Sequence, residues 1–296
     1  MKFRVNCLFI GIITLSLLSG KTFSQNDVAV TDTLSGSSLS EEKIKTHSLF
    51  AGAGYGSNMV YLGSTISQNK PYNYASITYG LKDVIYLSGS AVHLTDMSPF
   101  AAFYTFSASF SHAFSSWFDI SGGISRYQVQ QSLTDTLFNS FTYGEINLGI
   151  DWKILYTRLS AGGIFSGETR GYYQIKNSRY FQTPEFTKKK LYFSFDPYAN
   201  LIFGTITKSE TVSGTVINSF PPFRKHGGTG SQSVSTTKYT NLFTLVEVDF
   251  GIPVAFNSPR ITIEAEPGYI YPLYEDTYYP GTKGFLFLIS AYLRIF

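Results

Sequence analysis

Charged residues are scarce in this sequence, and cysteine is almost absent. Lys, Arg, Asp and Glu together make up 15% of the 296 residues, against about 25% in a typical soluble domain. The formal net charge is only +3, so the chain lacks the basic surface that nucleic-acid binding requires. One cysteine, Cys7, and four histidines exclude a disulfide framework and a Cys/His metal site. We therefore expect no nucleic-acid partner, no cofactor and no bound metal.

Long apolar runs are also missing, except at the start of the chain. Lys2 and Arg4 precede an apolar run at 5–18, and a small-x-small site follows at Thr22–Ser24. The apolar run is shorter than the 20 or so residues that a transmembrane helix needs. A basic start, a short apolar core and a cleavage site together predict a secretory signal peptide at residues 1–24.

Removal of that signal peptide takes Cys7 away and leaves a mature chain without cysteine. Residues 25–46 are polar and small, with neither helical nor strand periodicity, which predicts a flexible periplasmic lead-in. From residue 47 to residue 296 the pattern changes to a period of two, and we treat this range as one domain.

Alternation of apolar and small polar residues is the dominant signal in this domain. Phe106, Ala108 and Phe110 share one face of an extended segment, and serines occupy the other face, as expected for a β-strand. Eleven segments show this pattern: 47–57, 72–81, 84–93, 101–114, 117–128, 140–150, 154–166, 190–207, 238–254, 259–270 and 284–296.

The connections between these segments alternate between short turns and long loops, which is typical of a transmembrane barrel with short periplasmic turns. Both ends of such a chain should lie on the periplasmic side, so the number of strands should be even. The missing inward strand is best placed at about 171–186, where Tyr173, Ile175 and Phe181 alternate with polar residues. The predicted fold is therefore an all-β, antiparallel transmembrane barrel of 12 strands.

A soluble β-sandwich is the alternative, because it would also bury one face of each strand. Two features oppose it. The turns and loops alternate in length, and aromatic residues gather at strand ends, for example at Phe103, Tyr104, Phe114 and Trp117, as in the aromatic girdles of membrane barrels.

The last strand carries the most specific resemblance. Residues 285–296 alternate apolar positions and end on Phe296, with a further aromatic residue at Tyr292. In this respect residues 47–296 resemble an outer-membrane β-barrel of Gram-negative bacteria, of an uncharacterised type. Arg294 departs from the pattern, since that position is often aromatic.

The resemblance implies a location in the bacterial outer membrane. It also implies contact with outer-membrane lipid and lipopolysaccharide, and recognition of Tyr292 and Phe296 by the barrel assembly machinery. It does not indicate the oligomeric state.

Charged residues on the polar strand faces are the candidate site. We expect ten of them to face the lumen: Asp119, Glu145, Arg158, Asp196, Glu247, Asp249, Arg260, Glu264, Glu266 and Arg294. Two interpretations remain open. The charges form a salt-bridge network that braces and plugs the barrel, or they line a selective pore.

The acids at 247, 249, 264 and 266 are expected to form one inward patch. A turn at 256–258 would place Asp249 opposite Glu264 or Glu266. Because acids outnumber bases in the lumen, a conducting barrel should prefer cations. On the same strand, Ile263 should face lipid near the middle of the membrane and Thr262 the lumen.

A closed ring of 12 strands has a backbone radius of roughly 12 Å, which is too narrow for an open general porin. The first functional hypothesis is a narrow channel or a transporter of ions or small solutes. The alternative is a structural or surface-interaction barrel with a plugged lumen.

An outer-membrane lipid hydrolase is the least favoured hypothesis, with His93 and His112 as its only candidate bases in the barrel wall. No serine shares a face with either of them at hydrogen-bonding distance along its own strand. The longest loop, 208–237, is locally basic. It is interpreted either as a contact to lipopolysaccharide or lid on the pore, or as a solvated loop.

The segment Gly52–Gly56 resembles a dinucleotide-binding loop only superficially, because no helix follows it. Its glycines are better explained as places where the barrel wall bends or leaves space.

Overall fold

The computed structural model describes residues 46–61, 64–134, 136–165, 170–186, 190–211, 214–217, 238–273 and 283–296. The predicted signal peptide and all of the lead-in except Thr46 lie outside the described residues. So do residues 212–213 and 218–237 of the longest loop.

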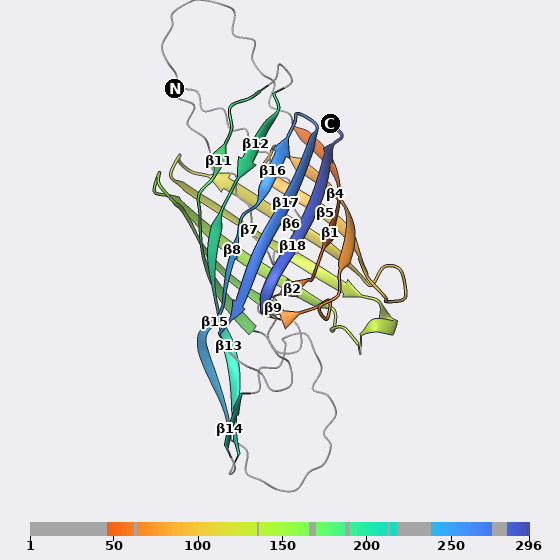
Figure 1. Cartoon of the computed structure of the whole chain (residues 1–296), viewed down its shortest axis with the longest axis vertical. Coiled ribbons are helices and arrows are strands. Elements are labelled where there is room, and N and C mark those ends of the chain that lie inside the picture. The colour runs from red at the N-terminus through yellow and green to blue at the C-terminus, as the bar shows by residue number, and fades with distance from the viewer. Residues whose placement is uncertain are drawn as a thin grey trace, which may run out of the picture.

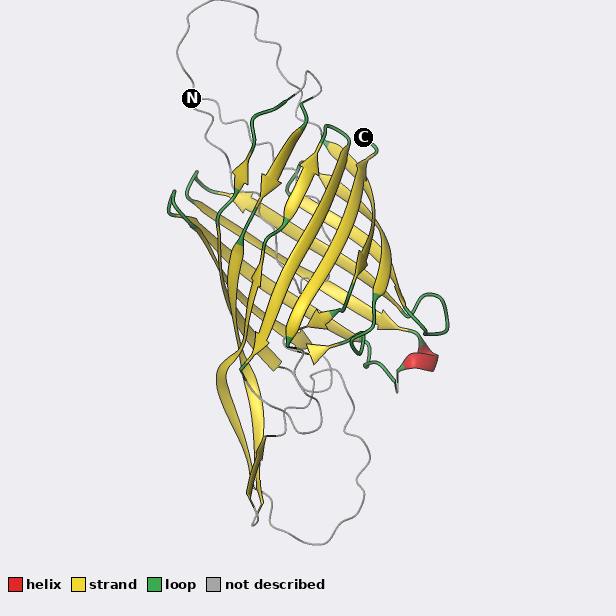
Figure 2. Ribbon diagram, in the orientation of Figure 1, coloured by secondary structure: helices red, strands yellow, loops and turns green. Residues whose placement is uncertain are grey.

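Twelve antiparallel strands close into a single barrel (Figures 1 and 2). Nine of them are uninterrupted: β1 (His47–Gly56), β4 (Tyr72–Leu81), β5 (Ile85–Leu94), β6 (Phe103–Ala113), β7 (Phe118–Val129), β8 (Phe141–Asp151), β9 (Tyr156–Phe165), β17 (Ile261–Pro272) and β18 (Gly284–Arg294).

The other three strands are each broken once. They are β10 (Arg170–Ser178) with β11 (Phe181–Gln182), β12 (Tyr192–Phe195) with β13 (Tyr198–Thr211), and β15 (Lys238–Gly251) with β16 (Val254–Asn257). The strand formed by β10 and β11 is the twelfth strand that parity predicted, and its presence confirms the even strand count. The first and last strands close the ring, since Gly52 of β1 pairs with Ser76 of β4 on one side and Tyr292 of β18 on the other.

In the described ranges, few elements lie outside the barrel wall. A small hairpin is formed by β2 (Val60–Tyr61) and β3 (Ser64–Thr65), β14 (Gly214–Ile217) pairs with β13, and η1 (Gln131–Leu133) is a single 3-10 turn. Among the described residues, no helix has the length and apolar character needed to cross a membrane.

The two rims of the barrel differ. We call the rim where β1 begins and β18 ends the terminal rim, and the opposite one the distal rim. The turns of the terminal rim are short, such as 82–84 and 114–117, whereas the loops of the distal rim include 57–71 and 130–140. This alternation is the one that the sequence predicts.

The strands present apolar side chains outward and bury their other face. On β6, for example, Phe106 is 57% exposed while Thr105 is fully buried, and on β17 Ile263 is 48% exposed while Thr262 is 6% exposed. The facing predicted from the period of two is therefore correct for these strands. The predicted depth of Ile263 is wrong, because it lies only two residues from the start of β17 at the terminal rim.

A bulge in β15 interrupts the alternation. The register between β13 and β15 shifts where Ile202 pairs with Glu247 but Phe203 pairs with Leu245. Val246 is the extra residue, and both Val246 and Glu247 are buried, as expected when a bulge inserts one residue into a ladder. Strict alternation with Glu247 and Asp249 would place Val246 on the outward face.

The predicted register of the acidic residues is also wrong. Asp249 pairs with Ile270, and Glu264 pairs with Ala255. The turn is centred further along the chain than expected, because the Ser258 N–H donates to the Ile261 carbonyl (2.9 Å) and Pro259 occupies the second turn position. Proline suits this position because its φ is already fixed near the required value.

A long hairpin arm projects beyond the distal rim (Figure 1). Pairing of β10 with β13 ends at Phe203, and pairing of β17 with β15 ends at Glu247. Beyond these points β13 and β15 continue to pair with each other as far as Glu210 and Lys238. Eight residues of β13 at about 3.3 Å each give the arm a length of roughly 25 Å.

Candidate functional site

Tyrosine rings fill much of the barrel interior, and eight of them each cover a glycine on a neighbouring strand. A Cβ atom built on Gly251, for example, would lie 2.5 Å from Cε1 of Tyr198, so only glycine leaves room for that ring. The eight pairs are Tyr72–Gly56, Tyr74–Gly54, Tyr86–Gly80, Tyr143–Gly162, Tyr156–Gly149, Tyr172–Gly204, Tyr198–Gly251 and Tyr292–Gly52.

Three of these glycines belong to the Gly52–Gly56 segment. The interpretation that they leave space is consistent with the structure, since the rings of Tyr292, Tyr74 and Tyr72 occupy it. By crossing the adjacent strand, a tyrosine also reaches a third strand with its hydroxyl. Tyr74 of β4 donates to Oγ of Ser290 on β18 at 2.9 Å, across β1.

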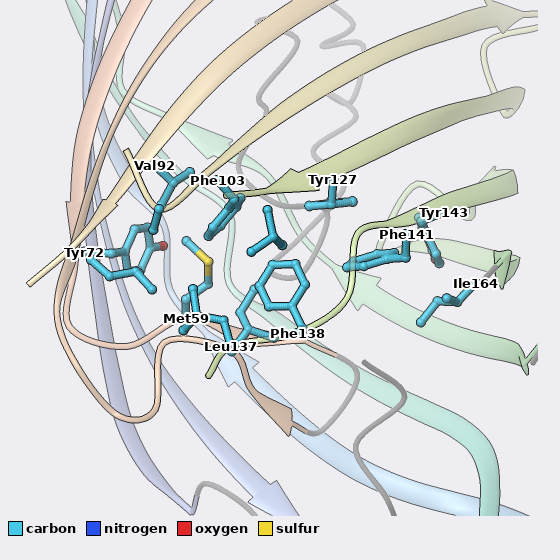
Figure 3. Packing of buried hydrophobic residues seen from close by; sticks show 14 of the residues in the cluster. Met59, Tyr72, Val92, Phe103, Tyr127, Leu137, Phe138, Phe141, Tyr143 and Ile164 are labelled. Atoms are coloured by element: carbon cyan, nitrogen blue, oxygen red, sulfur yellow. The ribbon is translucent and has the colours of Figure 1, made fainter. Parts of the chain in front are cut away.

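An apolar cluster occupies the lumen toward the distal rim (Figure 3). It contains wall residues such as Val92, Phe103 and Phe141, together with Met59 and Phe138 from the distal loops. The Phe103 and Phe138 rings meet edge to face with centroids 5.3 Å apart. Side chains of the distal loops thus pack against the wall residues inside the lumen.

The two loops that supply the cluster are joined to each other and folded internally. The Gln68 Nε2 donates to the Thr136 carbonyl (2.7 Å), which links loop 57–71 to loop 130–140. Within the first loop, Oδ1 of the buried Asn58 accepts from the hydroxyls of Thr65 (2.8 Å) and Ser67 (2.7 Å). These bonds hold the loop inward over the lumen.

Charged side chains lie on the terminal-rim side of this cluster, and we call them the charged layer. On β15, Val246 of the cluster is followed by Glu247 and Asp249; on β10, Tyr172 of the cluster is followed by Lys176. The buried charged residues are Arg158, Lys176, Glu247, Asp249, Glu264 and Glu266, all between 2% and 8% exposed. Asp119, Glu145, Asp196 and Arg294 are partly buried.

Tyrosine hydroxyls bind several of these carboxylates. Tyr156 donates to both Asp119 oxygens (3.2 and 3.0 Å), and Tyr198 donates to Oε1 of Glu266 (3.0 Å). Glu145 accepts from the Tyr143 hydroxyl (3.0 Å) and from Nδ2 of Asn147 (3.4 Å). Tyrosine O–H groups therefore provide hydrogen-bond donors for these three acids.

Lys176 is a member of the charged layer that the sequence analysis did not select. Its Nζ lies 3.8 Å from the centroid of the Tyr198 ring, and it is attracted by the charges of Glu266, Asp196 and Asp249. Lys176 lies on β10, where the alternation of apolar and polar residues is weakest, so the sequence did not determine which face Lys176 occupies. The alternation of Lys176 with Ile175 was the available signal.

Two arginines that we predicted to face the lumen, Arg260 and Arg294, are not among the buried charged residues. Arg260 is in the turn between β16 and β17 and is exposed, so it does not join the buried charges. Arg294 lies at the terminal rim over the Phe50 ring, with its Cζ 5.8 Å from the ring centroid. Near it, burial raises the pKa of the Asp83 carboxyl above its ordinary value, and the Arg294 charge partly offsets that rise.

The proposed assembly residues occupy different environments. Tyr292 is buried in the lumen, with its hydroxyl 3.0 Å from that of Tyr74. Phe296 is 51% exposed, beyond the end of β18.

The two candidate catalytic histidines make other contacts. His93 Nδ1 lies 2.6 Å from the Phe100 carbonyl and its ring stacks on Phe100. His112 is exposed and meets the Phe114 ring edge to face. Within the described part of the chain, no three His, Cys, Asp or Glu side chains converge as a metal site.

The outer surface is apolar and carries aromatic residues at both rims. Ile77, Ile124 and Ile146 are 53–61% exposed along the strands. Trp117 and Trp152 are exposed at the terminal rim and Phe165 and Phe285 toward the distal rim. An apolar band between two aromatic girdles is the exterior of a barrel that spans a bilayer.

Comparison with known proteins adds three solved barrels of very low sequence identity. The porin NanC has 9% identity and a TM-score of 0.45, over 83% of this chain and 98% of that chain. LpxR from Salmonella typhimurium has 7% identity and a TM-score of 0.42, over 82% and 99%. BamA from Haemophilus ducreyi, lacking POTRA domains 1–3, has 12% identity and a TM-score of 0.33, over 84% and 70%.

No protein-family model matches the sequence, and a search of curated protein sequences gave no match. The closed ring of twelve antiparallel strands and its girdled apolar exterior nevertheless define the class. The chain is a transmembrane β-barrel of twelve antiparallel strands.

Proposed function

We propose that this protein is a barrel whose lumen is filled by its own side chains, and that it acts through the surfaces it presents rather than as an open pore. The burial of the inward side chains supports this proposal. Thr105 and Phe103 are fully buried, and Glu247 and Asp249 are each 2% exposed. Side chains in contact with a water-filled bore would be accessible to water.

The distal side then carries the function. The barrel holds loops 57–71 and 130–140 in place and supports the arm formed by β13, β14 and β15. Loops held by a rigid scaffold are common sites of recognition. The proposal includes contacts with lipopolysaccharide at this rim and with the barrel assembly machinery at the last strand. It also includes the signal peptide at 1–24 and the periplasmic lead-in at 25–46.

A narrow channel for ions or small solutes is the second candidate. The charged layer favours it, because seven carboxylates (Asp119, Glu145, Asp196, Glu247, Asp249, Glu264 and Glu266) face two buried basic residues (Arg158 and Lys176) and one at the terminal rim (Arg294). If movement of the distal loops opened the lumen, this acidic excess would attract cations.

Conductance in planar bilayers distinguishes the two candidates. Insertion is first verified by flotation of proteoliposomes, and the filled barrel is then expected to give no stepwise current. Stepwise current from the wild-type protein would contradict the filled lumen. In that case a reversal potential favouring cations, weakened when Glu247, Asp249, Glu264 and Glu266 become amides, would establish the channel.

A further inference from the structure

Two neighbouring carboxylates in the charged layer are unusually poorly neutralised. Glu247 and Asp249 are two residues apart on β15, so both point into the lumen, and each is 2% exposed. The strongest charge acting on Glu247 is that of Asp249, which repels it. Burial of two like charges side by side is costly unless a positive charge accompanies them.

Three oxygen atoms at this place have no hydrogen-bond partner within the described part of the chain: Oε2 of Glu247, Oδ1 of Asp249 and Oδ1 of Asn200. Asn200 is 5% exposed and pairs directly with Asp249 across the β13–β15 ladder. Its Nδ2 donates to the other Asp249 oxygen at 3.2 Å. The amide is thereby held against the carboxylate while its own oxygen is left without a donor.

Lys176 supplies only part of the missing charge. It is attracted by Glu266, Asp196 and Asp249 together, and its ammonium lies over the Tyr198 ring. The positive charge of one lysine is therefore shared among three carboxylates and the face of the Tyr198 ring. Arg158, the other buried base, repels Lys176.

We propose that Glu247, Asp249 and Asn200 form a binding site for a hard divalent cation within the lumen. Carboxylate and amide oxygens are the ligands that such cations prefer, and Ca²⁺ accepts flexible geometry with waters completing about six to eight positions. Two carboxylates, one amide oxygen and water suit this tolerance better than the strict octahedron of Mg²⁺. A bound Ca²⁺ would neutralise both acids and tie β13 to β15.

The position of the site also fixes its route of access. The apolar cluster lies on its distal side, with Val246 and Ile202 directly adjacent along β15 and β13. The cation therefore enters from the terminal rim or during folding of the barrel. For this reason, the test compares protein that is folded in the presence of the cation with protein folded in a chelator.

The test measures the midpoint of thermal unfolding of the full barrel in detergent micelles, folded with Ca²⁺ or with chelator. The wild-type midpoint is expected to rise with Ca²⁺, and Asp249→Asn and Asn200→Leu are each expected to abolish the rise. The readout is the Ca²⁺-dependent shift within each variant, so a change in baseline stability does not affect it. Glu145→Gln is the matched control, since Glu145 has its own tyrosine and asparagine partners, and it should retain the full shift.

Direct binding gives a second readout. Tb³⁺ luminescence excited through tyrosine should appear in the wild-type barrel, be displaced by Ca²⁺, and be lost in Asp249→Asn. Absence of any Ca²⁺-dependent shift in the wild type, or an equal shift in Asp249→Asn, would overturn the proposal and indicate that the two acids share protons instead. Neither result depends on whether the barrel conducts.

Discussion

At the scale of the residue, the tyrosine–glycine pairs set the shape of the lumen. A methyl group on Gly251 would lie within 2.7 Å of three atoms of the Tyr198 ring and hydroxyl. At the outward-facing Gly89, in contrast, the nearest heavy atom to an added Cβ is 3.9 Å away. Space, rather than backbone conformation, is what glycine provides at residue 251.

We expect Gly251→Ala to lower the free energy of unfolding by about 1–3 kcal/mol, because a ring displaced from a packed interior must find another position. Gly89→Ala is the control and should change it far less. Urea unfolding in micelles, followed by tryptophan fluorescence, provides the measurement. Equal effects of the two substitutions would show that the rings do not depend on the glycines.

Residue-level prediction from the sequence was successful where a residue's own strand determines its environment. The inward facing of Glu247, Asp249, Glu264 and Glu266 followed from alternation, as did the outward facing of Phe106. The partners of these residues could not be predicted, because Tyr198 reaches Glu266 across an intervening strand. Lys176 was missed because the alternation along its strand is weak. Arg260 was wrongly included because the period of two does not determine which way a turn residue faces.

At the scale of the element, depth in the membrane decides what an outward position tolerates. Ile289 lies at the centre of β18 and is 41% exposed, whereas Ile295 lies beyond the end of that strand at the terminal rim and is 54% exposed. The two positions allow the same substitution to be compared at different depths.

Ile289→Arg is expected to cost about 2–4 kcal/mol, and Ile295→Arg about 0–1 kcal/mol, because the penalty for a lipid-facing arginine falls toward the interface. Unfolding free energies measured in lipid vesicles provide the comparison. A similar cost at both positions would mean that the bilayer does not cover the apolar band between the two aromatic girdles.

Strand number and facing could be predicted because they depend on the period of two and on parity. The register of β15 and β17 could not. It depends on the Ser258–Ile261 turn, where Pro259 shifts the centre. Alternation also does not reveal the bulge at Val246, which shifts the register between β13 and β15. The four acids still reach the lumen, but Asp249 lies opposite Ile270 and Glu264 opposite Ala255 rather than opposite other acids.

At the scale of the whole molecule, the interior is divided into an apolar part toward the distal rim and a charged, tyrosine-rich part on its terminal-rim side. The sequence predicted the barrel and its strand number. It could not show whether the lumen is open, because that depends on Met59 and Phe138 folding inward from loops. The filled lumen that we propose is thus a property of the assembled molecule.

Water accessibility of the lumen tests this claim most directly. Residues 25–296 contain no cysteine, so Thr105→Cys places a single thiol of similar size at a fully buried inward position. Ser132→Cys, at an exposed position of the distal loop, is the matched control. With a charged, water-soluble thiol reagent, we expect rapid labelling of Ser132→Cys, and labelling of Thr105→Cys only after denaturation. Rapid labelling of the folded Thr105→Cys protein would contradict the filled lumen.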